Sequence, residues 1–247
     1  MLRHKLLTVF AVALLSLSSV SPVYGQQTYA NSLVRSVSSP DLQPGQSGTL
    51  SVDVSNAFNR SMDNIVMTLS IYAFVDGSAY VPSSSIPSSH LPRFMGSGQP
   101  AESLTVSSIP VNASYNFSFP LQTGYGTPHG TFFNEGTYMV SMSIIFTIGF
   151  TLYRMASRGF FSPVQWQKIY VQNGSFAYLN YTYLNSTLGF AGILPDTSFG
   201  VNTPAPWYLF FASGVLAAAF GTAAFFSYRR THRRVHGKSH EKVREAP

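Results

Sequence analysis

The chain has no cysteine among its 247 residues, so no disulfide can form within it. A domain that is exported without disulfides has to be held together by its hydrophobic core alone. Exported domains of animal proteins usually carry such cross-links. We therefore interpret the absence of cysteine as typical of a prokaryotic cell envelope, and the glycosylation signals described below favour an archaeal one.

Charged side chains are also scarce in the long middle segment, residues 26–206, which holds six basic and seven acidic residues in 181 positions. The formal net charge of +6 comes from the two ends of the chain rather than from this segment. The basic pI of about 9.6 consequently gives no support for a nucleic-acid partner. Uncharged polar residues have to cover the surface of the segment, which suits glycans and close packing in an envelope.

Residue types that carry catalysis are rare in the same segment. It has two histidines, His90 and His129, and no Gly-x-Ser-x-Gly nucleophile motif. Asp53, Asp63 and Asp76 have carboxylates that suit calcium, but their spacing matches no calcium-binding loop. We therefore expect no enzyme activity, no cofactor and no metal site. The alternative, a ligand-binding receptor or hydrolase, needs a pocket that gathers His90 or His129 with carboxylates.

The first 25 residues have the pattern of a cleavable signal peptide. Arg3 and Lys5 precede an apolar run of 15 residues, Leu6 to Val20, and small residues suited to signal peptidase follow up to Gly25. We predict cleavage after Gly25. The alternative is an uncleaved N-terminal anchor, although the apolar run is shorter than the ~20 residues that a membrane span needs. Either version places the middle segment outside the cell.

An uncharged stretch of 22 residues, Trp207 to Tyr228, lies near the C-terminus. At about 1.5 Å per residue, a helix of this length spans roughly 33 Å, enough for the ~30 Å hydrocarbon core of a bilayer. Its aromatic ends match the interfacial belts of a membrane helix, and basic residues follow at once. Four of them are candidates for contact with lipid headgroups: Arg229, Arg230, Arg233 and Arg234. This pattern predicts a single-pass protein of the cell membrane, with its N-terminal domain extracellular and residues 229–247 as a cytoplasmic tail.

Between these ends, apolar and polar residues alternate with the period of two that is typical of half-buried β-strands. The longest such pattern runs from Tyr138 to Phe150. Further strands are predicted at 50–55, 65–73, 104–109, 115–121, 151–157, 164–171 and 176–183. Many short strands without interleaved helices predict an all-β fold, an immunoglobulin-like antiparallel β-sandwich over residues 26–172. We expect long loops at 81–99 and 124–134, and an additional strand followed by a membrane-proximal stalk at 173–206.

Two motifs resemble a known domain type. Pro44-Gly45 precedes an alternating strand that ends in Asn56, and Gly136-Thr137-Tyr138 is similar to a later Gly-x-Tyr strand start. These features resemble the CARDB-like and S-layer-related immunoglobulin-like domains of archaeal cell-envelope proteins, over roughly residues 34–147. The resemblance implies an extracellular adhesive or structural module without catalysis. The layout of the whole chain also resembles the beta subunit of the translocon-associated protein complex, which implies a membrane partner near the secretion channel.

The exported segment contains six Asn-x-Ser/Thr acceptors for N-glycosylation: Asn59, Asn112, Asn116, Asn173, Asn180 and Asn185. Some such triplets arise by chance in a chain rich in Asn, Ser and Thr, so occupancy is predicted for the set rather than for each site. Asn116 alternates with Tyr115, Phe117 and Phe119, so its side chain is predicted to point away from the apolar face of its strand.

The aromatic residues after position 159 allow two interpretations. They form either an exposed contact surface, since aromatics are favoured at interfaces, or part of the hydrophobic core. The residues concerned are Phe160, Phe161, Trp166, Tyr178, Tyr181 and Tyr183. The sequence leaves both interpretations open.

Small residues recur along one side of the predicted membrane span. They are Ser213, Ala217 and Gly221, with Gly214 and Ala218 beside them. Such a stripe permits the close approach of a second helix, either from another copy of the chain or from a polytopic partner. Ala and Gly are also common in spans that have no partner, so chance is the third explanation.

These features predict a single-span membrane-anchored protein of the cell envelope. Its N-glycosylated extracellular β-sandwich is expected to serve a structural, adhesion or assembly role. A protein partner is expected through the exported domain or through the small-residue side of the span, and a homodimer is one form of this. The alternative is an accessory subunit of a membrane complex such as the protein-secretion translocon.

Overall fold

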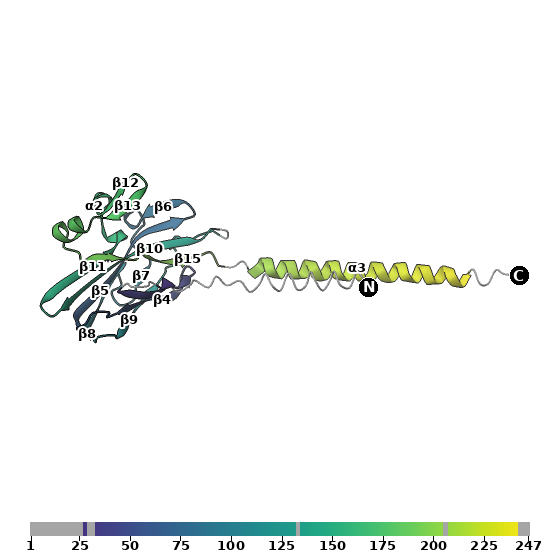
Figure 1. Ribbon diagram of the computed structural model, residues 1–247. Coiled ribbons are helices and arrows are strands. Elements are labelled where there is room, and N and C mark those ends of the chain that lie inside the picture. Colours follow the sequence, from purple (N-terminus) through teal and green to yellow (C-terminus); the bar gives the residue numbers. More distant parts are fainter. Residues whose placement is uncertain (1–26, 29–32, 132–133, 205–206, 242–247) are drawn as a thin grey trace. The chain divides into compact units, whose positions relative to one another are not determined.

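The computed structural model of the protein describes residues 27–28, 33–131, 134–204 and 207–241 (Figure 1). The predicted signal peptide, residues 1–25, lies outside the described residues. The chain divides into two compact units, Met1–Thr203 and Pro204–Pro247. Of the elements in the described residues, all strands belong to the first unit, and the second unit has one helix.

Two large β-sheets form the sandwich of the first unit, and a separate two-stranded sheet lies within residues 170–179. In the smaller sheet the strands lie in the order β1 (Gln27–Thr28), β2 (Val34–Ser38), β4 (Ser47–Ser55), β9 (Ser114–Gln122) and β7 (Arg93–Phe94). The larger sheet has the order β14 (Gly192–Leu194), β11 (Thr151–Ser157), β10 (Gly136–Ile148), β15 (Thr197–Val201) and β3 (Asp41–Leu42). In the same sheet β5 (Met62–Asp76) pairs with β10, β6 (Ala79–Pro82) and β8 (Ala101–Ile109). All pairings are antiparallel except β11 with β14 and β15 with β3.

The strand order is that of an immunoglobulin-like sandwich. If β2, β4, β5, β7, β9, β10 and β15 are taken as strands A to G, the sheets contain the orders A-B-E-D and C-F-G of the constant-type arrangement, and β6 and β8 are additional strands that pair with strand C. A second feature of such domains is present at the start of β10. The Tyr138 hydroxyl donates a hydrogen bond to the backbone oxygen of Pro128, ten residues upstream, at 2.9 Å. This is the tyrosine corner of the fold.

The hydrophobic core lies between the two sheets. Its largest fully buried side chains are Tyr138, Phe94, Phe117, Phe119, Phe146 and Phe199. The predicted alternation of β10 is confirmed from Tyr138 to Phe146, where every second side chain is buried. The predicted alternation is wrong at the C-terminal end of the pattern. The chain turns at Gly149, whose φ is 60°, and Phe150 at this hairpin tip is fully exposed.

The first of the two motifs that carried the family resemblance has structural roles at both of its ends. Gly45 has a φ of 85° in the turn before β4, a backbone conformation that glycine adopts without strain. Asn56, which follows β4, is buried, and its Nδ2 donates to the backbone oxygens of Arg60 and Ile109 at 2.9 Å each. The Asn56 side chain therefore ties the β4–β5 connection to the end of β8.

Residues 164–171, predicted to be a strand, are mostly helical instead. The helix α2 spans Pro163–Ile169, and β12 (Tyr170–Asn173) follows it. Ser162 caps the helix, since its side chain accepts from the backbone N–H of Gln165 and the Gln165 side chain accepts from the backbone N–H of Ser162. This reciprocal capping box, with Pro163 in the first turn, outweighs the period-two pattern of the segment.

Residues 176–183 also differ from the prediction. The strand β13 covers only Phe176–Leu179 and forms a hairpin with β12. A helical turn follows over Tyr183–Thr187, and Asn180 starts it, because its Oδ1 accepts from the backbone N–H of Tyr183 at 3.0 Å. The short polar side chain of asparagine favours such a helix start over further strand.

The stalk expected before the membrane span belongs in large part to the sandwich. Residues 197–201 form β15, which pairs with β10 on one side and with β3 on the other. Thr197, Phe199 and Val201 are buried. The loops expected at 81–99 and 124–134 hold only short elements in their described parts: the end of β6, a turn of 3-10 helix at Ser83–Ser85, β7 and a bridge from Gly130 to Asn202.

The second unit contains α3, a helix of 35 residues over Trp207–Glu241. Within it, the 18 residues Phe211–Tyr228 have a mean hydropathy of 1.4, and none is buried. Among the described residues, α3 is the one helix long and apolar enough to cross a membrane. It continues beyond the predicted span, so Arg229, Arg230, Arg233 and Arg234 are part of the helix.

Candidate functional site: an aromatic groove

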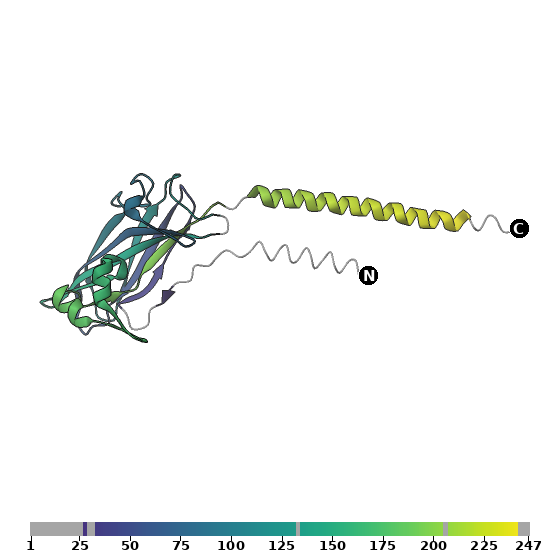
Figure 2. The ribbon, with the colours of Figure 1, turned by 90° about the horizontal axis from the view of Figure 1, so that it is seen from above.

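A cap lies on the outer face of the larger sheet. It consists of residues Arg158–Phe190, which connect β11 to β14, and it includes α2 and the β12–β13 hairpin. In Figure 1 these elements lie on the side of β10 and β11 that is opposite to β4 and β9. The turned view in Figure 2 shows the helical turns of the cap in green against the sheet. A small hydrophobic cluster separate from the main core holds the cap: Ala156, Phe161, Ile169, Leu184 and Phe190, with Trp166, Leu179, Tyr183, Leu188 and Ile193 packed against them.

The aromatic residues of the cap divide between the two interpretations that the sequence allowed. Phe161, Trp166 and Tyr183 belong to the hydrophobic cluster. Phe160, Tyr178 and Tyr181 are 48%, 55% and 60% exposed. The cap therefore has an aromatic core and an aromatic surface.

A groove of about 690 Å³ lies between the cap and the strands β5, β6 and β10. This volume is within the range of ~300–1,000 Å³ that is usual for small-molecule sites. We call it the aromatic groove. Its lining residues are Tyr72, Val75, Tyr80, Met139, Arg158, Gly159, Phe161, Pro163, Trp166, Gln167 and Asp196.

Tyr72 lines the groove from β5, which bulges at this residue. Met139 of β10 pairs with Ala73 and Val140 pairs with Ile71, so Tyr72 is the extra residue of β5. Bulges re-aim side chains and are common next to functional sites. A Cβ atom on Gly159 would lie 2.3 Å from the Tyr72 ring. The glycine therefore allows the cap to lie against this ring.

Trp166 is fixed in the opposite wall by its neighbours. Its ring stacks on that of Tyr170, with centroids 6.0 Å apart and planes 5° from parallel. The guanidinium of Arg158 lies 5.6 Å from the centroid of the indole, in the range of a cation–π contact. Since Trp166 also packs against the cluster under the cap, its position does not depend on a ligand.

Two opposite charges act on the Tyr72 hydroxyl. Burial raises the pKa of Tyr72 above its ordinary value, the nearby carboxylate of Asp196 and the hydroxyl of Tyr80 raise it further, and Arg158 lowers it. Both charged side chains are exposed at the rim of the groove. The groove is therefore apolar in its walls, and it carries one positive and one negative group.

The titration of Tyr72 gives a test of this arrangement. Because its folded-state pKa is raised, Tyr72 stays neutral after tyrosines of the unfolded chain ionise near pH ~10, so stability falls as the pH rises through this range. We expect Asp196→Asn to lower the pKa of Tyr72 and Arg158→Gln to raise it. The difference in ultraviolet absorbance between each protein and its Tyr72→Phe counterpart isolates this titration. Identical curves in all three backgrounds would contradict the groove geometry.

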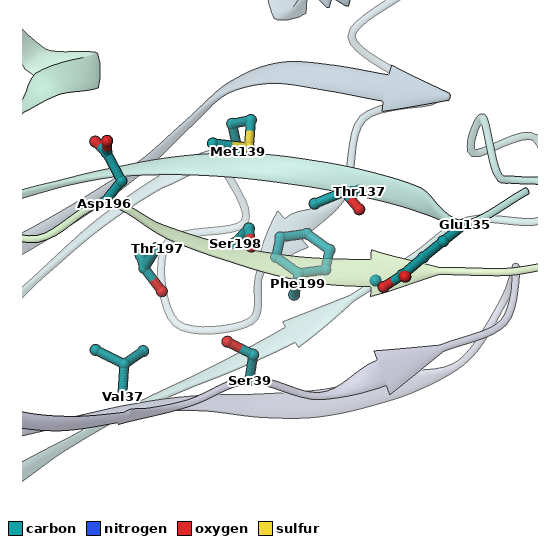
Figure 3. A pocket seen from close by; sticks show the side chains of 10 residues that line it. Val37, Ser39, Glu135, Thr137, Met139, Asp196, Thr197, Ser198 and Phe199 are labelled. Carbon is teal, nitrogen blue, oxygen red and sulfur yellow. The ribbon is translucent and has the colours of Figure 1, made fainter. Parts of the chain in front are cut away.

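A smaller trough of about 290 Å³ adjoins the groove, since Met139 and Asp196 line both. Figure 3 shows Asp196 and Glu135 at its two ends, with Ser39 and Ser198 between them. Nearby, Asp41 accepts a hydrogen bond from Asn202 Nδ2 at 2.7 Å. The described residues contain no group of three or more His, Cys, Asp or Glu side chains placed to hold a metal ion.

The histidines and aspartates weighed in the sequence lie away from the aromatic groove. His90 and His129 are exposed, and the His129 ring is bonded to the backbone oxygen of Thr127. Asp53 lies 4.0 Å from Arg35 on the smaller sheet. Asp63 and Asp76 lie at opposite ends of β5, and Asp63 accepts hydrogen bonds from two serine hydroxyls. None of these five residues lines the aromatic groove or the trough beside it.

All six glycosylation candidates lie in the first unit. Five are exposed: Asn59, Asn112, Asn116, Asn173 and Asn185. Asn180 is half-buried at the start of the helical turn. The prediction for Asn116 is confirmed, since its side chain is exposed whereas Phe117 and Phe119 are buried. On the same strand Tyr115, predicted with the apolar face, is 44% exposed.

The small residues predicted to form a stripe all lie in α3, where Ser213, Ala217 and Gly221 are four residues apart. Ser213, Gly214, Ala217, Ala218 and Gly221 are all exposed in this unit. A Cβ atom on Gly214 or Gly221 would meet no atom within 4 Å.

No family model and no curated protein matches this chain. Among solved structures it is similar to Spo0M, a sporulation control protein from Bacillus subtilis, at 16% identity and a TM-score of 0.25, with 49% of this chain and 44% of that chain covered. It is also similar to PapD-like domain 7 of human CEP192, an ASH domain, at 11% identity and a TM-score of 0.27, with 56% and 93% covered. A third is AvmM, described as catalysing macrocyclization in alchivemycin A biosynthesis, at 11% identity and a TM-score of 0.28, with 73% and 97% covered. The chain thus spans less than half the length of Spo0M, and all three TM-scores are low.

Sequence reasoning identified Phe161 and Trp166 but missed the groove that they line. Two further wall residues, Tyr72 and Tyr80, lie about 80 positions earlier in the chain. Tyr72 lies between Ile71 and Ala73, which are buried, so the alternation of side chains along a strand places Tyr72 on the outer face. What covers that face is a matter of tertiary packing, for which this sequence has no local signal.

Proposed function

We propose that this protein is a single-span component of a cell envelope whose sandwich faces the outside and serves adhesion or assembly, binding a partner in the aromatic groove. The groove is the observation that carries the proposal. It offers partly exposed aromatic rings beside polar groups, and such amphipathic rings are favoured where proteins bind ligands or other proteins.

Three further observations support the exterior location. The apolar part of α3 has the length of a membrane span, and the arginines after it match the bias for basic residues on the cytoplasmic side. All the sequons lie before the span, and five are exposed.

Co-purification from the native membrane tests this function. The full-length protein, tagged and extracted in mild detergent, is analysed by mass spectrometry for partners and for glycopeptides. We expect surface proteins, or the protein itself, together with glycans on exposed sequons such as Asn116. Recovery of secretion-channel subunits with unmodified sequons would contradict the envelope role and favour the accessory-subunit alternative.

The small-residue side of α3 gives that alternative its own test. If a membrane partner packs there, replacing Gly214 and Gly221 with Leu blocks the close approach of its helix and abolishes co-purification. Leu216→Ala and Phe220→Ala on the other side of the helix are the matched controls and keep the partner. If the envelope role is right, we expect the Gly→Leu variants to recover the same partners as the native chain, because binding occurs in the sandwich.

A further inference from the structure

The aromatic groove presents rings that differ in accessibility. Phe161 is buried and Tyr72 is half-buried, so they form the inner walls. Tyr80, on the short strand β6, is 60% exposed. A ligand in the groove would therefore find a ring at the entrance that protein atoms cover only in part.

The polar groups of the groove lie at its rim. Arg158, Gln167 and Asp196 are exposed, and all three line it. The guanidinium and the carboxamide donate hydrogen bonds, and the carboxylate accepts them. Arg158 and Asp196 have opposite signs, and both influence the same hydroxyl, that of Tyr72.

These features narrow the class of ligand. A cation would be attracted by Asp196 and repelled by Arg158, and an anion the reverse, so the rim gives no net preference for a charged ligand of either sign. A wholly apolar ligand would cover the charged rim without forming hydrogen bonds to it, which is costly. An uncharged molecule with a flat apolar face and many hydroxyls satisfies both parts of the groove.

We propose that the aromatic groove binds an uncharged hexopyranose unit of a glycan, an inference that rests on the adhesive function proposed above. The C–H face of the sugar ring lies against Tyr80, and its hydroxyls bond to Gln167, Arg158 and Asp196. Envelope polysaccharides and N-linked glycans on another copy of the chain both offer such units. Since Asn116 lies on the smaller sheet and the groove lies on the larger one, the two are on opposite faces of the sandwich.

Intrinsic fluorescence provides the assay. The chain has two tryptophans, Trp166 in the groove and Trp207 in α3. Trp207→Phe leaves Trp166 as the single reporter in the full-length protein, held in lipid nanodiscs. The probes are the methyl glycosides of glucose, mannose and galactose, with glucuronate and glucosamine as charged counterparts. We expect a saturable change with at least one neutral glycoside, with a Kd near ~1 mM, which is a weak single-site affinity.

Tyr80→Ala is the decisive variant, because its exposed side chain is not needed for the core. We expect it to raise Kd about 10-fold or more, because a single stacked ring can contribute an affinity of this size. Tyr178→Ala is the control, since Tyr178 is similarly exposed, at 55%, but does not line the groove. It should leave Kd unchanged.

Several results would overturn the inference. These are no saturable fluorescence change with any neutral glycoside, an unchanged Kd in Tyr80→Ala, or a saturable change only with the charged sugars or only with a peptide. If a partner still co-purifies and is lost with Tyr80→Ala, the sugar class is wrong and the proposed function stands. If neither sugar nor partner binds, both fail. Replacing the Ser or Thr of each sequon with Ala keeps the Asn180 side chain at the start of its helical turn and separates the sources, because binding between copies is lost only if the sugar is N-linked.

Discussion

Replacing Tyr138 with Ala is expected to cost about 3–5 kcal/mol of stability, as is usual for a large side chain deleted from a core. Tyr138 is fully buried, and its ring centroid lies 4.8 Å from that of Phe74 and 5.4 Å from that of Phe199. A domain without disulfides has a total stability of ~5–15 kcal/mol, so this loss is a large share of it. Urea unfolding followed by circular dichroism measures the change.

The conservative variant separates packing from the hydrogen bond. Tyr138→Phe keeps the ring but removes the donor to the Pro128 oxygen, so we expect a smaller loss, about 1–2 kcal/mol. Burial also raises the pKa of Tyr138 above its ordinary range, so this residue contributes a loss of stability as the pH rises above ~10, absent in Tyr138→Phe. Tyr178→Ala, at an exposed position, should change stability by less than ~0.5 kcal/mol. Equal losses in Tyr138→Ala and Tyr178→Ala would contradict the assigned core.

Gly136→Ala is expected to destabilise the sandwich by about 3 kcal/mol, although it adds a single methyl group. A Cβ at Gly136 would lie 2.3 Å from the backbone nitrogen of Gly130 and 2.7 Å from the backbone oxygen of Val201. Backbone atoms cannot rotate away, and the Gly130 N–H donates a hydrogen bond to the Val201 oxygen at 3.0 Å. The three segments that meet here would have to separate. For a domain of this size the melting temperature should fall by roughly 6–12 °C.

The control for Gly136→Ala is another loop glycine with room for a methyl group. A Cβ on Gly124 would meet its nearest atom, the Thr127 Oγ1, at 3.6 Å, which is an ordinary contact. Gly124→Ala should therefore leave the melting temperature within a few degrees of the native value, as a surface substitution does. If both glycine variants melt like the native chain, the contact between the start of β10 and the end of β15 is wrong.

The alternation of apolar residues was enough to predict the sheets but not the cap. In β5 and β10 the period of two extends over many residues, and burial on one face follows from it. Residues 164–167 also alternate, yet they lie in α2, because Ser162, Pro163 and Gln165 supply a helix start. The capping box is readable in the sequence, and for a segment this short it is a better guide than the alternation.

The last strand shows a second reason for error. Thr197, Phe199 and Val201 alternate with Ser198 and Gly200, which is a strand pattern of only five residues. Pro195 before it and Pro204 after it gave the segment the composition of a linker. Its place in the sheet is determined by pairing with β10, a partner about 60 residues earlier. The aromatic groove depends on the same long-range packing. Composition therefore indicated some of its aromatic residues but could not predict that they line one groove.

Site-specific photo-cross-linking in the native membrane tests the central claim most directly. A photoreactive phenylalanine analogue replaces Tyr80 in the groove or, as the control, Tyr178 on the outside of the cap. The account predicts that position 80 captures a partner that position 178 does not, and that excess neutral glycoside reduces the capture. Equal capture at both positions, or none at position 80 in a membrane where the protein is present and folded, would contradict binding in the groove.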